Sequence, residues 1–198
     1  MKKNVLRSAL WICSLLFLPG LSGRLKAQQI IAYYSGKAKQ ISKYYNHQIT
    51  EIIFSFCHLS GNRLTVDNKK DTLTIRSLVA LKKKNKQLKI LLSLGGWGGC
   101  KTCSDVFSSD SGRVEFAESV IALTSYFQTD GIDLDWEFPA LAAYPEHPFK
   151  VEDKVNFTLL IKTLRNIMGK SKEISVICAG VSPFLEGSLD LPDIAPYV

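Results

Sequence analysis

The sequence has few residues that could hold a metal ion. It contains three histidines among 198 residues, and His47, His58 and His147 show no spacing typical of metal ligands. Its one Cys-x-x-Cys pair, Cys100 and Cys103, is half of a zinc site, and no second pair completes it. We therefore expect no metal site.

The sequence also lacks an N-terminal apolar run long enough to cross a bilayer comfortably. Residues 1–27 have a basic start (Lys2, Lys3 and Arg7), a short apolar core at 10–18 and a possible cleavage site before Gln28. This pattern predicts a secretory signal peptide over 1–27 and a secreted protein, extracellular or periplasmic, with no membrane association after cleavage. An uncleaved membrane anchor is the alternative.

The remaining chain has almost no charge excess. The net charge of the whole sequence is +7, but residues 1–27 hold five basic and no acidic residues, which leaves 20 basic against 18 acidic residues. The one basic cluster after residue 27, Lys82 to Lys84 with Lys86, is predicted to lie on a solvated helix surface. Nucleic acid is therefore not an expected partner.

What the sequence does contain is an alternation of strands and helices. Apolar patterns predict strands at 30–34, 52–57, 88–94, 130–137 and 174–179, and helices at 72–85, 113–128 and 153–168. A short segment at 41–45 separates the first two strands. Strands that alternate with helices predict a parallel sheet joined by right-handed crossovers. No linker interrupts residues 28–198, so we expect a single α/β domain there.

The fourth strand carries an unusual row of acids. Side chains two residues apart on a strand point to the same face, so Asp133, Asp135 and Glu137 are predicted to lie together. Crowded carboxylates cannot all ionise, so at least one pKa should rise, and Glu137 is the best candidate for a general acid. A cation-binding strand end or a chance run of acids are the alternatives.

Residues 130–137, D-G-I-D-L-D-W-E, resemble the D-x-x-D-x-D-x-E signature of family-18 glycoside hydrolases, the chitinases. The resemblance implies a (β/α)8 TIM barrel, of which residues 29–198 cover about the first five strands. We therefore expect a truncated barrel whose sheet has two open edges. We also expect residues 1–198 alone to be prone to aggregation and inactive.

The resemblance also implies roles for the acids. In this family the substrate's own N-acetyl group attacks the anomeric carbon, so no metal or organic cofactor is needed. Glu137 would be the general acid and base, Asp135 would hold the acetamido group, and Asp133 would tune Asp135 through a shared proton or a hydrogen bond. Asp130 would be structural and off their face, and Ser93 would support the acids from the neighbouring strand.

Further positions resemble the family's sugar-binding groove. Ser93 begins an S-x-G-G motif that is followed by Trp97, and its glycines, including Gly96, allow close approach of a neighbour or a ligand. Trp97 is expected to line the groove, with a buried core position as the alternative. Tyr34 is expected to face the pocket in preference to Tyr33. Phe138 stands where many members have Tyr.

The resemblance implies a chitinase that binds chitin or chitooligosaccharides and is monomeric when full length. An endo-β-N-acetylglucosaminidase and an inactive chitin-binding remnant are the alternatives. The family's M-x-Y-D motif, whose Tyr holds the acetyl group, is expected past Val198. In an exported protein a disulfide between Cys100 and Cys103 is expected, and Cys57 and Cys178 are expected to be buried thiols.

Overall fold

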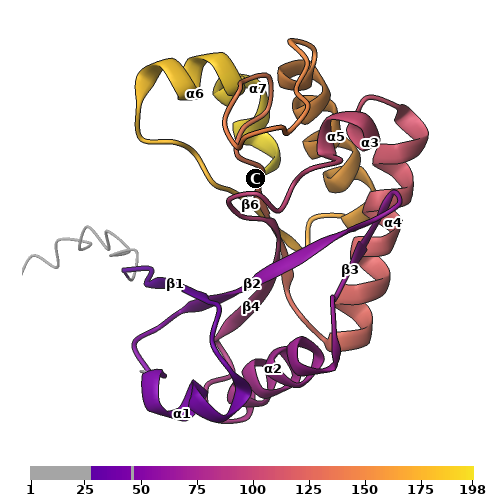
Figure 1. Ribbon diagram of the computed structural model, residues 1–198. Coiled ribbons are helices and arrows are strands. Elements are labelled where there is room, and N and C mark those ends of the chain that lie inside the picture. Colours follow the sequence, from indigo (N-terminus) through magenta and orange to yellow (C-terminus); the bar gives the residue numbers. More distant parts are fainter. Residues whose placement is uncertain (1–27, 46) are drawn as a thin grey trace, which may run out of the picture.

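The computed structural model describes residues 28–45 and 47–198, so the predicted signal peptide lies outside the described residues. Five parallel strands form one sheet in the order β1-β2-β4-β5-β6 (Figure 1). They are β1 (Ile31–Tyr34), β2 (Glu51–Ser60), β4 (Lys89–Gly95), β5 (Gly131–Asp135) and β6 (Glu173–Val176). All five predicted strands are confirmed, and the fold is a partial (β/α)8 barrel.

The predicted helices are also present. They are α2 (Lys69–Ala80), α4 (Asp110–Phe127) and α5 (Asp153–Met168). The short segment at 41–45, for which no helix was predicted, contains the helix α1 (Ile41–Tyr44). Asn68 caps α2 by accepting hydrogen bonds from two backbone N–H groups, and Ser109 caps α4 in the same way through one. In Figure 1, α2, α4 and α5 follow one another around the outside of the sheet, which leaves its concave face free of helices.

Several short elements were not predicted. They are β3 (Arg63–Thr65), α3 (Cys103–Phe107), α6 (Ser182–Ser188), α7 (Leu191–Ile194) and two short 3-10 helices, η1 (Ala38–Gln40) and η3 (Ala195–Tyr197). A further 3-10 helix, η2 (Leu81–Lys83), continues α2 within the helix predicted at 72–85. Strand β3 folds back on β2, and its Leu64 N–H donates to Ser119 Oγ on α4. Such short segments depend on distant contacts, which periodicity does not report.

The core lies between the sheet and the helices. On β4, Ile90, Leu92 and Leu94 are buried in this layer, and Leu91 and Ser93 point to the opposite, concave face. Strands β1 and β6 are the two edges of the sheet. Within the described residues β1 pairs only with β2 and β6 only with β5, so both edges are open as expected. No helix in this described part is long and apolar enough to span a membrane.

Candidate active site

The row of acids lies on the concave face of the sheet. Asp133 is fully buried, Asp135 is 7 % exposed, and Glu137 is half-buried two residues past the last hydrogen-bonded residue of β5. Trp136 points the other way and packs between Phe107 and Phe157 in the helical layer. The predicted separation of acids and apolar residues is therefore confirmed, and the acids occupy the carboxyl end of a parallel strand, where barrels place their active sites.

Asp133 accepts hydrogen bonds from three hydroxyl groups. Ser93 on β4 donates to its Oδ2 at 2.7 Å, while Ser175 on β6 and Tyr33 on β1 donate to its Oδ1 at 2.6 and 3.1 Å. Both serines lie directly opposite Asp133 in the strand register. The predicted support from Ser93 is thus present, and Ser175 and Tyr33 join it.

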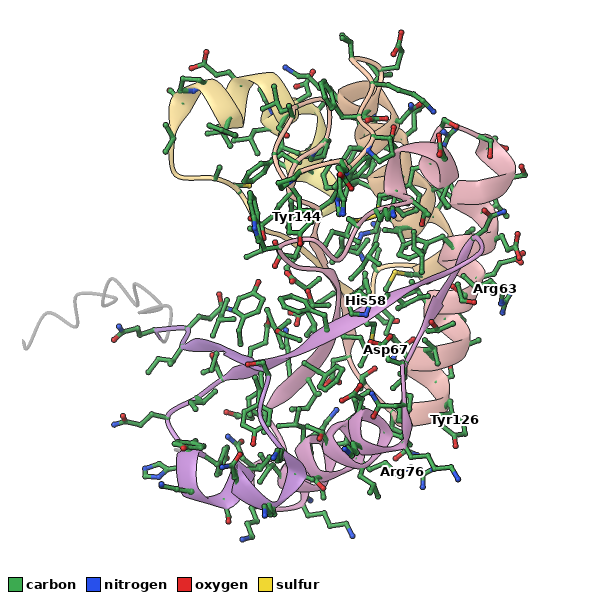
Figure 2. The ribbon with its side chains drawn as sticks, viewed as in Figure 1. His58, Arg63, Asp67, Arg76, Tyr126 and Tyr144 are labelled. Atoms are coloured by element: carbon green, nitrogen blue, oxygen red, sulfur yellow. A yellow bond between two sulfur atoms is a disulfide. The ribbon has the colours of Figure 1, made fainter. Side chains whose placement is uncertain are left out.

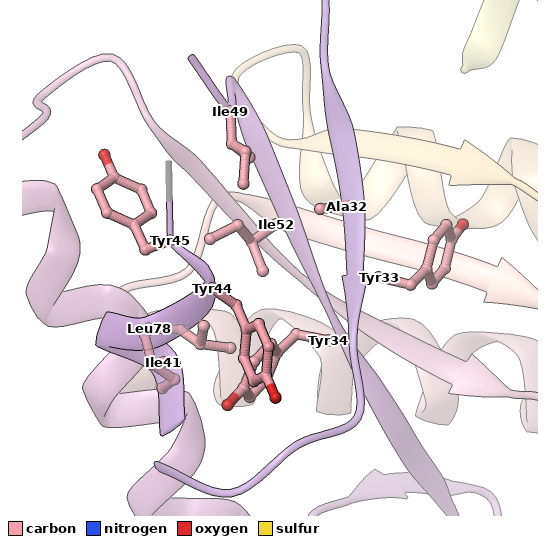
Figure 3. Close-up of a pocket in the computed structure, with 9 residues that line it drawn as sticks. All are labelled: Ala32, Tyr33, Tyr34, Ile41, Tyr44, Tyr45, Ile49, Ile52 and Leu78. Carbon is pink, nitrogen blue, oxygen red and sulfur yellow. The ribbon is translucent and has the colours of Figure 1, made fainter. Parts of the chain in front are cut away.

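Tyr33, and not Tyr34, faces the acids, so the prediction for Tyr34 was wrong. The Tyr34 hydroxyl donates to the Lys37 carbonyl at 2.7 Å. Its ring lies in an apolar pocket on the outside of β1, beside Ile41 and Leu78, while Tyr33 projects from the opposite face of the strand (Figure 3). Alternation made one tyrosine face inward, but only the register with β2 and its neighbours determines which one.

The pKa values of two acids in the row are raised. Burial, followed by the nearby charges of Glu137 and Asp133, raises the pKa of Asp135 to about 7. Burial also raises the pKa of Glu137, and its hydrogen bond with Asp135 acts in the opposite direction. Burial is therefore the main reason that a pKa in the row lies near neutral, with crowding as the smaller cause, and the larger of the two increases falls on Asp135 and not on Glu137.

Two further groups on the concave face have raised pKa values. Burial and the charge of Asp133 raise the pKa of Tyr33 well above its ordinary value, so its phenol remains a hydrogen-bond donor. Burial raises the pKa of Glu51 on β2, and the charge of Lys89 opposes that rise. Lys89 also pairs with Glu173 at the amino ends of β4 and β6. Charged residues therefore lie at both ends of this concave face.

Gly95, the last residue of β4, and Gly96 after it let the end of this strand approach β5. Gly95 has a φ of +111°, and a Cβ there would lie 2.2 Å from the Asp135 carbonyl oxygen. Gly96 has a φ of +80°, its N–H donates to the same carbonyl at 2.9 Å, and a Cβ there would collide with Phe56. Only glycine fits such positions. The contacts of Gly96 are therefore with β5 and Phe56, and its predicted sugar contact stays a prediction.

Trp97 lies at the rim, 60 % exposed, and is therefore not a core residue. Its ring meets Tyr144 edge to face at 5.6 Å, and Tyr144 lies 4.6 Å from the ring of His147. Figure 2 labels Tyr144 above the long strand β2, and Tyr126 lies below that strand at the lower right. A lone Tyr in the loop after β5 belongs to no sequence pattern, so no role was predicted for Tyr144.

The remaining predicted residues lie beside this site. Phe138 is half-buried and packs on Phe184 of α6 at 5.2 Å. Asp130 accepts two hydrogen bonds from Lys82 Nζ, both 2.7 Å, and one from the Ile90 N–H at 2.8 Å. The prediction that Asp130 is structural and points away from the other acids is therefore consistent with its contacts.

The four cysteines among residues 28–45 and 47–198 divide into one pair and two single thiols. Cys100 and Cys103 form the predicted disulfide in the loop after β4. Cys57 is a buried thiol as predicted, but Cys178 is exposed, because β6 ends at Val176 and leaves Cys178 outside the sheet. Among residues 28–45 and 47–198, no group of three or more His, Cys, Asp or Glu side chains is arranged to hold a metal ion.

Residues 29–198 match the family described as glycosyl hydrolases family 18. Chitinase A1 of Niallia circulans is 34 % identical over 131 residues, which is 63 % of this chain and 19 % of that protein. Chitotriosidase-1 of Mus musculus is 36 % identical over 116 residues, which is 58 % of this chain and 24 % of that protein. The chain thus spans about a fifth to a quarter of the length of these relatives.

Solved structures are similar over most of this chain and about half of theirs. The chitinase domain of the spore coat protein CotE from Clostridium difficile has a TM-score of 0.78 and 28 % identity, and the match covers 86 % of this chain and 48 % of that one. A family-18 N-acetylglucosaminidase from Paenibacillus barengoltzii has a TM-score of 0.72 and 26 % identity, with 86 % and 51 % covered. Human YKL-39, a pseudo-chitinase that retains chitooligosaccharide binding, is 20 % identical with a TM-score of 0.69 and shares the fold.

Proposed function

The chain belongs to glycosyl hydrolases family 18, and we propose that it carries the acid machinery of a secreted chitinase that cleaves β-1,4-linked N-acetylglucosamine. The observation that supports this proposal is the buried row of Asp133 and Asp135 that leads to Glu137, a more accessible carboxyl group. We further propose that residues 1–27 direct export and are removed, and that the natural protein acts as a monomer on chitin or chitooligosaccharides.

The proposed mechanism is retaining and substrate-assisted. Glu137 donates its proton to the glycosidic oxygen as the bond to the anomeric carbon breaks. The acetamido carbonyl oxygen of the same sugar forms the new bond to that carbon, which gives an oxazolinium ion. Asp135 accepts a hydrogen bond from the acetamido N–H and stabilises the positive charge. Glu137 then takes a proton from water, whose oxygen attacks the anomeric carbon and restores the original configuration.

The protonation of the site without substrate is compatible with these catalytic steps. The pKa of Asp135 is about 7, and its hydrogen bond with Glu137 keeps a proton between these two residues near neutral pH. Binding of the acetamido group would bring Asp135 an N–H donor and favour its ionised form, which would leave the proton on Glu137. Asp133, whose oxygens accept three hydroxyl bonds, acts on Asp135 through its charge.

Trp97 supplies the proposed sugar-binding surface. Its exposed ring stands at the carboxyl end of the sheet and offers an apolar face to the C–H groups of a pyranose. Phe138 lies beside Glu137 and has no hydroxyl, so it would contribute only apolar contact.

A second candidate activity is hydrolysis of glycoprotein glycans by an endo-β-N-acetylglucosaminidase. The same acids would serve it, and only the substrate differs. A binding protein without turnover is a third candidate, because the fold is shared with the pseudo-chitinase YKL-39. The presence of Glu137 favours hydrolysis over binding alone.

The test is Glu137→Gln in the natural protein, with Glu118→Gln on the exposed face of α4 as the matched control. We expect Glu137→Gln to abolish hydrolysis of chitohexaose while it retains binding, and the control to behave as wild type. NMR of the first product should show the β-anomer. Undiminished hydrolysis by Glu137→Gln would refute the assignment, and cleavage of glycans but not of chitohexaose would favour the second candidate.

A further inference from the structure

Tyr144 contacts the loop that carries Trp97. It lies in the loop between β5 and α5 (residues 136–152, the Tyr144 loop), and Trp97 lies in the loop between β4 and α3 (residues 96–102, the Trp97 loop). The two rings meet edge to face, with centroids 5.6 Å apart. A Cβ at Gly98, whose φ is +84°, would lie 2.8 Å from the Tyr144 ring. The Trp97 loop therefore needs glycine where this tyrosine packs on it.

The two loops are also joined at their base. Asp153, the first residue of α5, is fully buried. It accepts a hydrogen bond from Ser104 Oγ of α3 at 3.0 Å and one from the Lys150 N–H of the Tyr144 loop at 2.7 Å. The disulfide between Cys100 and Cys103 closes the end of the Trp97 loop. Both loops are thus anchored at both ends, and the contact between Tyr144 and Trp97 joins them at the rim.

The Trp97 side chain has few neighbours to fix its orientation. It is 60 % exposed, and among the described residues Tyr144 is the one aromatic ring that contacts it. An exposed indole rotates about its side-chain bonds unless a neighbour restrains it. A side chain that becomes ordered only when a ligand binds weakens the affinity by about two- to twelvefold. A fixed Trp97 ring would avoid that loss.

Tyr144 is itself held from its other side. The N–H of His147 donates to the Tyr144 carbonyl at 3.2 Å, and the two rings lie 4.6 Å apart. The three rings form a row from His147 through Tyr144 to Trp97. Tyr144 is 38 % exposed, so Trp97 is the more accessible of the two rings that meet at the rim. Tyr144 therefore lies between the restrained part of its own loop and the ring proposed to bind sugar.

We propose that Tyr144 is a positioning residue that fixes the orientation of the Trp97 ring and so prepares it to bind N-acetylglucosamine units. This inference rests on the proposed function, because it deepens the sugar-binding role proposed for Trp97. Tyr144 acts through Trp97 and not by contact with the sugar. Its contribution to affinity should therefore disappear when Trp97 is removed.

The experiment is a double-mutant cycle in the Glu137→Gln variant of the natural protein. Tyr144→Ala removes the ring, Tyr144→Phe keeps it, and Tyr126→Ala removes an exposed ring of α4 as the matched control. Each change is made with Trp97 intact and in Trp97→Ala. Calorimetry measures the affinity for chitotetraose, and a thermal melt of each variant reports folding.

We expect Tyr144→Ala to weaken binding about fivefold when Trp97 is intact, which corresponds to about 1 kcal/mol. In Trp97→Ala the same change should alter affinity by less than about 1.5-fold. Tyr144→Phe and Tyr126→Ala should bind within about 1.5-fold of the parent. Equal losses with and without Trp97 would overturn the proposal, because they would show that Tyr144 binds the sugar itself. An unchanged affinity in Tyr144→Ala would overturn it too.

A second readout needs no ligand. The heteronuclear NOE of the Trp97 indole N–H reports the fast motion of its ring, and the buried Trp136 serves as the internal reference. We expect the Trp97 value to fall in Tyr144→Ala and to stay unchanged in Tyr144→Phe. An unchanged value in Tyr144→Ala would overturn the inference. If the protein binds no N-acetylglucosamine oligomer, the proposed function fails, while this measurement still decides whether Tyr144 holds Trp97.

Discussion

Tyr33 on β1 donates a hydrogen bond to Asp133 on β5, although two strands, β2 and β4, lie between them. In a flat sheet, strands three apart are separated by about 14 Å, which is too far for a tyrosine to cross while standing upright from its strand. The bond of 3.1 Å therefore shows that the sheet curls toward its concave face. This curvature brings residues 100 positions apart in the chain into one site.

The Tyr33 hydroxyl should matter for catalysis and the Tyr34 hydroxyl should not. Tyr33→Phe removes one donor from the buried Asp133, and we expect kcat to fall about tenfold, because an unsatisfied buried acceptor costs roughly 1 to 3 kcal/mol. Tyr34→Phe removes a bond to the exposed Lys37 carbonyl and should remain within about twofold of wild type. Steady-state hydrolysis of chitohexaose measures both. Equal losses in the two variants would contradict this distinction.

Asp135 should destabilise the protein as the pH rises. Its carboxyl group has a pKa of about 7 in the fold and an ordinary value of 3.8, so between these values the folded state binds a proton that the unfolded state does not. Stability from this group is therefore lost as pH rises from about 4 to about 7.

Asp135→Asn cannot ionise and removes that cost. We expect the variant's Tm to exceed the wild-type Tm by about 3 °C at pH 8, with little difference at pH 4, while hydrolysis falls by orders of magnitude. Thermal melts of both proteins at the two pH values supply the comparison. A Tm difference that does not vary with pH would show that Asp135 is not protonated preferentially in the fold.

Trp97 should contribute binding and not stability. In a Glu137→Gln background, Trp97→Ala should weaken binding of chitotetraose about tenfold, because an aromatic surface is lost. Tyr126 is a matched control, since it is 64 % exposed and lies on α4 away from the site (Figure 2). Tyr126→Ala should leave affinity unchanged, and neither variant should shift the free energy of unfolding by more than about 0.5 kcal/mol. Calorimetry that shows equal affinities for both variants would exclude Trp97 from the groove.

Asp130 should contribute stability and not catalysis. Its carboxylate forms an ion pair with Lys82 and accepts a hydrogen bond from the Ile90 N–H. The side chains of Asp130 and Lys82 are both partly exposed. Asp130→Asn should lower the free energy of unfolding by about 1 kcal/mol and keep kcat within about twofold of wild type. Lys82→Met, which removes only the ion pair, should cost less. Urea unfolding measures the first effect, and a large loss of kcat without a loss of stability would contradict the structural role.

The site residues that were predicted correctly from the sequence have positions that depend on their near neighbours in the chain. The acids of β5 face one way and Trp136 the other because side-chain alternation is a property of the strand itself. The glycines at 95 and 96 were recognised from their motif, and the structure adds that the Asp135 carbonyl and the Phe56 ring exclude a Cβ there. The tyrosine choice failed because it depends on how β1 aligns with strands that follow it.

The sequence by itself determined the family, the order of strands and helices, and the face on which Asp133, Asp135 and Glu137 stand, since each of these follows from patterns within a few residues. Only the tertiary structure decided that Tyr33 and Ser175 join Ser93 in donating hydrogen bonds to Asp133, and that burial raises the pKa of Asp135. Those facts depend on strand register, sheet curvature and burial. All three are set by packing between segments far apart in the chain, and no local pattern records them.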